Sequence, residues 1–140
     1  MTDYQHRSLS DFDPHPQKPG RRWAVSKELG LEEYNLNVAV LEKGEPLSQT
    51  HFHAHEAQDE FYYVLDGRCR LELEDESVTV EADDVVTVPR GVPHLVHNPI
   101  YEEPCKLLAI GSPPEGRYPV TMHENHENIL AERYDEAELD

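Results

Sequence analysis

Two histidines and a glutamate lie close together in the chain at a spacing suited to metal binding. His53 and His55 are two residues apart in a segment that favours a β-strand, so both imidazoles should point to one face with Cα atoms about 6.6 Å apart. Two rings at that separation can converge on one ion at ligand distances of about 2.0–2.2 Å. Glu60 comes just before the next expected strand, which should pair antiparallel with the histidine strand and return a carboxylate to the same place.

A third histidine lies far along the chain. His94 directly follows a Pro-x-Gly-x-Pro loop, residues 89–93, which fixes the backbone before another expected strand. A barrel could bring that strand opposite the first three residues. Three neutral imidazoles and one carboxylate suit Fe(II), Mn(II), Ni(II), Zn(II) or Co(II), and they leave two positions of an octahedral ion open. The sequence therefore predicts one divalent transition-metal ion with four ligands: His53, His55, Glu60 and His94.

The elements that must position these residues are short β-strands. Between residues 35 and 110, valines and leucines alternate with polar residues, and turn residues recur at close spacing. Asp66-Gly67 is the strongest signal for a two-residue hairpin. Many short strands with frequent turns favour an antiparallel β-barrel or jelly roll. We therefore predict an all-β fold, with no helix of ten or more residues before the C-terminal tail.

The 140 residues suit a single domain with extensions at both ends. Residues 1–20 are expected to form an extended N-terminal arm, because three prolines and a glycine come in quick succession. Residues 21–112 should form the barrel. Residues 113–140 are polar and acidic and should form a short tail, in which residues 128–138 could make a surface helix.

The composition disfavours several classes of partner. Twenty-nine acidic residues against twelve basic ones give a formal net charge of −17, which should repel nucleic acid and anionic lipid. No run of 18 apolar residues and no secretory signal are visible. Cys69 and Cys105 are expected to be reduced thiols, with a single bridge as the alternative. We expect a cytoplasmic protein, and its four lysines beside eight arginines suggest adaptation to high salt.

The proposed ligands resemble the two sequence motifs of the cupin superfamily. The first motif is H-x-H, three or four residues, Glu, six residues and Gly, and it is matched by His53, His55, Glu60 and Gly67. The second is P-x-G-x2-H-x3-N, and it is matched by Pro89, Gly91, His94 and Asn98. The leading glycine of each motif is misplaced: Asp83 occupies that position in the second, and eight residues rather than five separate Gly44 from His53 in the first.

This resemblance implies a cupin barrel with a metal ion, and it leaves the reaction open. Cupins with three histidines and a glutamate include dioxygenases, decarboxylases and isomerases, so the first hypothesis is a metal-dependent enzyme acting on a small organic molecule. No catalytic residue is assigned, although Glu60 could act as a base. The alternative is a non-catalytic module that binds or senses a small molecule through its metal. A homodimer is expected on the resemblance alone.

Four other histidines are weaker candidates. His51 shares the face of the histidine pair and is expected at the rim of the site rather than as a ligand. His97 should point away from His94 and be structural or exposed. His123 and His126 flank a glutamate in the tail, where a solvated segment is favoured over a second metal.

Tyr62 and three arginines complete the candidates. Tyr62 should face inward with Glu60, either lining the pocket or packing in the core. Arg68 and Arg70 are expected to face outward. An isomerase of sugar phosphates would need a basic pocket, for which the sequence offers Arg90 and little else, so this function ranks last.

Overall fold

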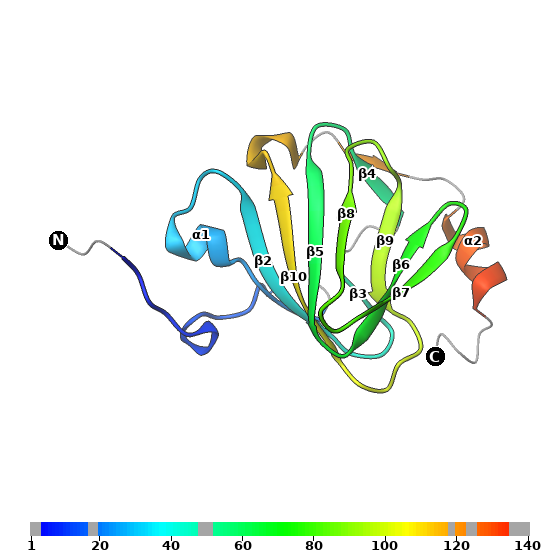
Figure 1. Cartoon of the computed structure of the whole chain (residues 1–140), viewed down its shortest axis with the longest axis horizontal. Helices are drawn as coiled ribbons and strands as arrows, with labels where there is room; N and C mark the ends of the chain where they lie inside the picture. The colour runs from blue at the N-terminus through cyan, green and yellow to red at the C-terminus, as the bar shows by residue number, and fades with distance from the viewer. Residues whose placement is uncertain (1–3, 17–19, 48–51, 118–119, 123–125, 135–140) are drawn as a thin grey trace.

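The computed structural model describes residues 4–16, 20–47, 52–117, 120–122 and 126–134. Two antiparallel sheets face each other (Figure 1). The first contains, in spatial order, β1 (Arg21–Trp23), β2 (Asn35–Leu41), β10 (Cys105–Ser112), β5 (Asp59–Asp66) and β8 (Val85–Val88). The second contains β11 (Val120–Met122), β4 (His53–His55), β9 (His94–Asn98), β6 (Arg68–Leu73) and β7 (Ser77–Glu81), with β3 (Glu45–Pro46) also paired to β9. This arrangement confirms the predicted all-β, jelly-roll fold.

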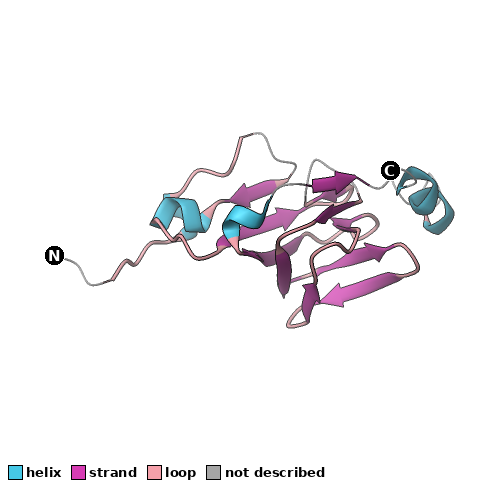
Figure 2. Ribbon diagram, turned by 90° about the horizontal axis from the view of Figure 1, so that it is seen from above, coloured by secondary structure: helices cyan, strands magenta, loops and turns pink. Residues whose placement is uncertain are grey.

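Helices are short and lie at the ends of the two layers (Figure 2). They are η1 (Leu9–Asp11), α1 (Val25–Leu29), η2 (Pro114–Arg117) and α2 (His126–Arg133). α1 is a short helix that Gly30 ends in a left-handed conformation. α2 begins two residues earlier than the predicted tail helix, and residues 135–140 lie outside the description. None of the described helices is long and apolar enough to cross a membrane.

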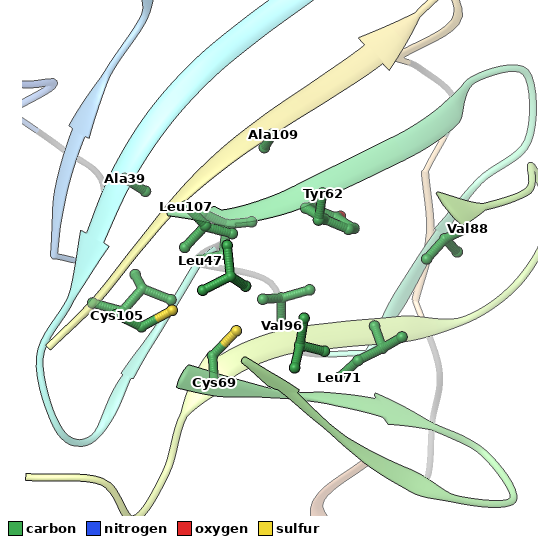
Figure 3. Close-up of a cluster of buried hydrophobic side chains, with 13 residues drawn as sticks. Ala39, Leu47, Tyr62, Cys69, Leu71, Val88, Val96, Cys105, Leu107 and Ala109 are labelled. Atoms are coloured by element: carbon green, nitrogen blue, oxygen red, sulfur yellow. The ribbon is translucent and has the colours of Figure 1, made fainter. Parts of the chain in front are cut away.

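The core lies between the sheets and is built from every second residue of the strands (Figure 3). In β10, Cys105, Leu107 and Ala109 are buried, and Leu71 and Val96 face them from the second sheet. This period of two confirms the alternation seen in the sequence.

Cys69 and Cys105 are both free and buried in this core, with their sulfur atoms turned toward each other (Figure 3). Contact with Cys105 and burial raise the pKa of the Cys69 thiol far above its usual range. These thiols therefore behave as small apolar core residues.

The predicted two-residue hairpin at Asp66-Gly67 is wrong. β5 pairs with β8 and β10, whereas β6 pairs with β7 and β9, so this turn carries the chain from one sheet to the other. Gly67 has φ +76°, and a Cβ built there would lie 2.2 Å from the carbonyl oxygen of Pro104. The glycine is needed for a close approach of two backbones rather than for a hairpin.

We expect Gly67→Ala to destabilise the fold more than Gly30→Ala. Both glycines have positive φ, +76° and +73°, so a side chain at either should cost about 1–2 kcal/mol. A Cβ at Gly30 meets no atom within 4 Å, whereas the one at Gly67 meets rigid backbone. Urea unfolding should show a further loss of about 1–3 kcal/mol for Gly67→Ala. Equal losses for the two variants would contradict the importance of this close approach.

Candidate metal centre

Three of the four predicted ligands converge between the two sheets. One ligand atom from each of His53, Glu60 and His94 lies within 4.8 Å of the other two. His53 and His94 are buried, and the Glu60 side chain is only 12% exposed. Two imidazoles and a carboxylate therefore meet in a largely buried site.

The strands that bring these residues together differ from the expected ones. His53 of β4 and His94 of β9 are direct partners in the register of neighbouring strands, and their ring centroids are 4.8 Å apart. Residues paired in this way share one face of the sheet, so both rings point inward. Glu60 reaches the same place from β5, in the facing sheet. The expectations that β5 pairs with the histidine strand and that His94 lies opposite it are both wrong, because the chain changes sheets between His55 and Glu60.

His55 lies beside this group without being part of it. Its Nε2 is 2.7 Å from Glu60 Oε1, and its ring centroid is 5.0 Å from that of His53. The three converging ligand atoms come from the other residues. The role of His55 as a fourth ligand therefore stays a prediction.

The loop before β9 sets the orientation of His94. His94 Nδ1 is 2.9 Å from the carbonyl oxygen of Val92. Because a carbonyl oxygen can only accept, Nδ1 carries the proton and donates it. In the neutral ring, Nε2 then keeps its lone pair and points toward Glu60 and Tyr62. This is the arrangement that prepares a histidine to bind a metal.

Tyr62 belongs to both the core and the site. It is buried among the apolar residues, and its hydroxyl donates a hydrogen bond to Glu60 Oε2 and lies 3.1 Å from His94 Nε2. Burial and the charge of Glu60 raise the pKa of Tyr62, so its hydroxyl stays protonated near neutral pH. Tyr62 therefore both lines the site and packs in the core, the two alternatives that the sequence left open.

Glu60 is a largely buried carboxylate, and its charge must be compensated by its neighbours. Burial by itself would raise the pKa of its carboxyl, but the adjacent side chains of His55 and His94 outweigh burial and lower the pKa far below the usual range. Its Oε1 atom is buried and has no hydrogen-bond partner among the described residues, although His55 Nε2 lies nearby. A buried carboxylate oxygen without a well-aligned donor is costly, and a cation would satisfy it. The residues present therefore fit a divalent metal ion.

Arg22 is a nearby charged residue that the sequence analysis did not single out. It lies opposite the buried, inward-facing Ala39 in the register of β1 and β2, and its Nη1 donates to the carbonyl oxygen of Leu47. Burial and Glu60 raise the pKa of Tyr62, and the positive charge of Arg22 acts in the opposite direction. β1 has only three residues, which is too short for a pattern of inward and outward positions to be recognised.

The remaining candidates lie away from this centre. His97 is buried on the other side of β9, with Nε2 2.7 Å from Glu72 Oε2, and is a structural residue. Arg90 is exposed and forms an ion pair with Asp59. Arg70 lies on the outer side of β6 with Ser77 and Thr79, as expected.

Some sequence predictions concern residues whose positions are not described. His51 and His123 lie outside the described residues, and only the backbone of His126 in α2 is described. Arg68, by contrast, is exposed, with its guanidinium carbon 4.3 Å from the centre of the Tyr101 ring.

Comparison with known proteins finds a matching family model and related sequences. Residues 37–111, more than half of the chain, match the family model described as the cupin domain. An uncharacterised protein of Methanocaldococcus jannaschii is 36% identical over 67 residues, which cover 48% of this chain and 53% of that protein. The chain thus matches about half the length of this relative.

Two solved structures extend the similarity to the fold. A cupin-like protein of Thermotoga maritima has a TM-score of 0.65 at 17% identity, covering 97% of this chain and 99% of its own. A putative sugar phosphate isomerase of Acidithiobacillus ferrooxidans has a TM-score of 0.59 at 25% identity, covering 65% and 57%. With its family-model match, its two facing antiparallel sheets and its inward cluster of histidine and glutamate side chains, the chain belongs to the cupin family.

Proposed function

We propose that this cupin binds one divalent transition-metal ion through His53, His55, Glu60 and His94 and acts with it on a small organic molecule. The observation that carries the proposal is the buried Glu60 carboxylate, which faces two converging histidines and has one oxygen without a hydrogen-bond partner among the described residues. This donor set suits iron, manganese, nickel, zinc or cobalt. Four protein ligands would leave room in the coordination sphere for a further molecule.

A bound ion would supply a Lewis acid that polarises an oxygen atom of the small molecule. The protein's own groups would orient that molecule and handle its protons. The side chains of His55 and Glu60 are 13% and 12% exposed, whereas that of His94 is 2% exposed, which supports entry from the side of His55 and Glu60. The Tyr62 hydroxyl donates its hydrogen to Glu60 Oε2 and so fixes the orientation of that carboxylate beside the site.

Dioxygenase-like chemistry, or a related metal-dependent reaction, is the first choice on the family resemblance. The isomerase alternative has two structural neighbours with that description, but it has little support from the site. Arg90, the residue it would need, is exposed and already paired with Asp59. The second candidate is a non-catalytic module in which the metal holds a ligand that leaves unchanged.

We also propose that two copies associate through the outer face of the first sheet. On this face Val85 is 60% exposed and Leu65 44% exposed. Beside them lies a groove of about 370 Å³ with Phe61 and Ile110 in its wall. Exposed apolar patches of this kind often mark association surfaces.

The proposal also includes a cytoplasmic location, which the two buried thiols support. It includes adaptation to high salt, which the net charge of −17 supports.

Metal analysis should find about one divalent transition-metal ion per chain in protein purified without a chelator or an affinity tag. Protein reloaded with Fe(II) without oxygen should then consume oxygen with one of a panel of diketones, flavonols and thiols. A compound that raises the melting temperature but is recovered unchanged would favour the binding module. Metal-free protein that takes up none of the five metals would overturn both candidates.

Replacing the carboxylate should remove metal binding without unfolding the protein. At a metal concentration about 100 times the Kd, binding stabilises the wild type by about 2.7 kcal/mol, a rise in melting temperature of roughly 8–12 °C. Glu60→Gln should lose this rise because it lacks the negative charge. Asp59→Asn, a change to the adjacent exposed carboxylate, should keep it. A full metal-dependent rise in Glu60→Gln would contradict the proposed site.

The same measurement distinguishes a ligand from a neighbour at His55. If His55 binds the ion, His55→Gln should weaken the affinity by more than about 100-fold, beyond the 10–100-fold typical of a residue that only supports a ligand. An unchanged affinity would restrict the ligand set to His53, Glu60 and His94.

Association through the apolar face should strengthen with salt. High ionic strength screens repulsion between two copies that each carry a charge of −17, and the apolar contact persists. Sedimentation velocity should show more dimer in molar KCl than in dilute buffer, and Val85→Glu should shift both samples toward monomer. A wild-type monomer at every salt concentration would exclude this association.

A further inference from the structure

A second buried carboxylate lies outside the metal centre. Glu72 of β6 is fully buried and accepts hydrogen bonds from three side chains: His97 Nε2 at 2.7 Å, Arg133 Nη1 at 2.9 Å and Tyr134 Oη at 2.5 Å. Burial by itself would raise the pKa of Glu72, but hydrogen bonds from His97, Tyr134 and Ser77, with His97 foremost, lower it to about 2. The carboxylate is therefore ionised and well compensated.

Two of these three partners come from the end of the chain. We call β11 together with α2 and Tyr134 the C-terminal segment. Arg133 Nη2 also donates to the carbonyl oxygen of Glu74, and the Tyr134 hydroxyl lies 3.2 Å from Ser77 Oγ. The Tyr134 ring meets the His97 ring edge-on at 5.8 Å. Glu72 is thus the centre of the contact that docks α2 beside β6 and β7 (Figure 1).

The same segment is paired with the histidine strand. β11 matches β4 at three positions: Val120 with His55, Thr121 with Ala54, and Met122 with His53. On its other side, β4 is matched to β9 at one position, His53 with His94, and the backbone N–H of Gly91 donates to the carbonyl oxygen of His55. Among the described strands, β11 therefore has the longer pairing with β4, at three positions against one for β9.

The docked helix limits where β11 can lie. Only three residues separate Met122 from the start of α2 at His126. An edge strand of three residues has little stability of its own. Fixing the nearby helix keeps β11 close to β4 and lowers the entropic cost of pairing. Release of α2 should therefore loosen β11 and, through it, β4.

We propose that Glu72 is a positioning residue for the metal centre: it anchors the C-terminal segment, and the anchored segment holds β4 so that His53 and His55 stay in register with His94. This proposal rests on the proposed metal site. Glu72 lies on the outer side of the sheet that carries His53 and His94 on its inner side, and it reaches the site through the anchored segment and the backbone of β4. Its other contact on that side is with His97 of β9, which Tyr134→Phe leaves in place.

The test compares two tyrosine-to-phenylalanine changes on the same outer face. Tyr134→Phe removes the hydroxyl that binds Glu72. Tyr101→Phe is the matched control, because its hydroxyl lies 3.4 Å from Arg70 Nη1 and Thr79 Oγ1 and does not belong to the C-terminal segment. Glu72→Gln, a larger change at the anchor itself, serves as the second variant. Amide hydrogen exchange is measured on metal-free protein, and the Kd for Zn(II) is measured by calorimetry.

Tyr134→Phe should speed exchange about tenfold or more in residues 52–55 and 120–122 while leaving β5 and β10 unchanged. The Kd for Zn(II) should rise by about 10–100-fold, and Glu72→Gln should give at least the same change. Tyr101→Phe should alter neither quantity. This local pattern differs from a general loss of stability, which would speed exchange in β5 and β10 as well.

Faster exchange in α2 and β11 with unchanged exchange in β4 and an unchanged Kd would overturn the proposal. So would wild-type behaviour in both anchor variants, or uniformly faster exchange in all strands. If the wild type binds no Zn(II) or other divalent metal, the proposed function fails. The exchange rates of β4 in metal-free protein then decide by themselves whether Glu72 positions the histidine strand.

Discussion

A carboxylate held inside an apolar double sheet is the constraint on which the centre of this protein depends. Glu60 lies beside core residues of β5 and β10, where an uncompensated charge would cost several kcal/mol. Tyr62 satisfies one of its oxygens, and the imidazoles of His55 and His94 surround it. Because Val92 fixes the proton of His94 on Nδ1, a neutral His94 has a lone pair rather than a hydrogen to offer. A cation would satisfy this set of acceptors.

The second buried carboxylate shows what a purely structural solution looks like in the same chain. Glu72 is more deeply buried than Glu60, yet three donors from His97, Arg133 and Tyr134 satisfy it. Glu60 keeps one oxygen without a hydrogen-bond partner among the described residues. The two glutamates lie on opposite sides of the second sheet, and they differ in how completely hydrogen-bond donors compensate the charge of the carboxylate. That difference, rather than burial, distinguishes the candidate metal centre.

The geometry of the centre depends on two different kinds of contact. The distance between His53 and His94 is set by hydrogen bonding between neighbouring strands of one sheet. The distance from either histidine to Glu60 is set by the packing of one sheet on the other. Core side chains between the sheets, such as Val96 and Leu107, therefore help to position the ligands without touching them. A change in how the two sheets pack would therefore also change the distance between Glu60 and the two histidines.

The sequence by itself determined the types of the proposed metal ligands, the alternation of the strands and the resemblance to cupins. A period of two shows which face of a strand a residue occupies, so it placed Tyr62 inward with Glu60 and His97 away from His94. Only the tertiary structure decided that β4 lies beside β9 and faces β5, that the Asp66-Gly67 turn changes sheets, and that the chain end docks on Glu72. A side-chain pattern carries no information about which strand is the neighbour, because pairing is set by backbone hydrogen bonds and burial between residues distant in the chain.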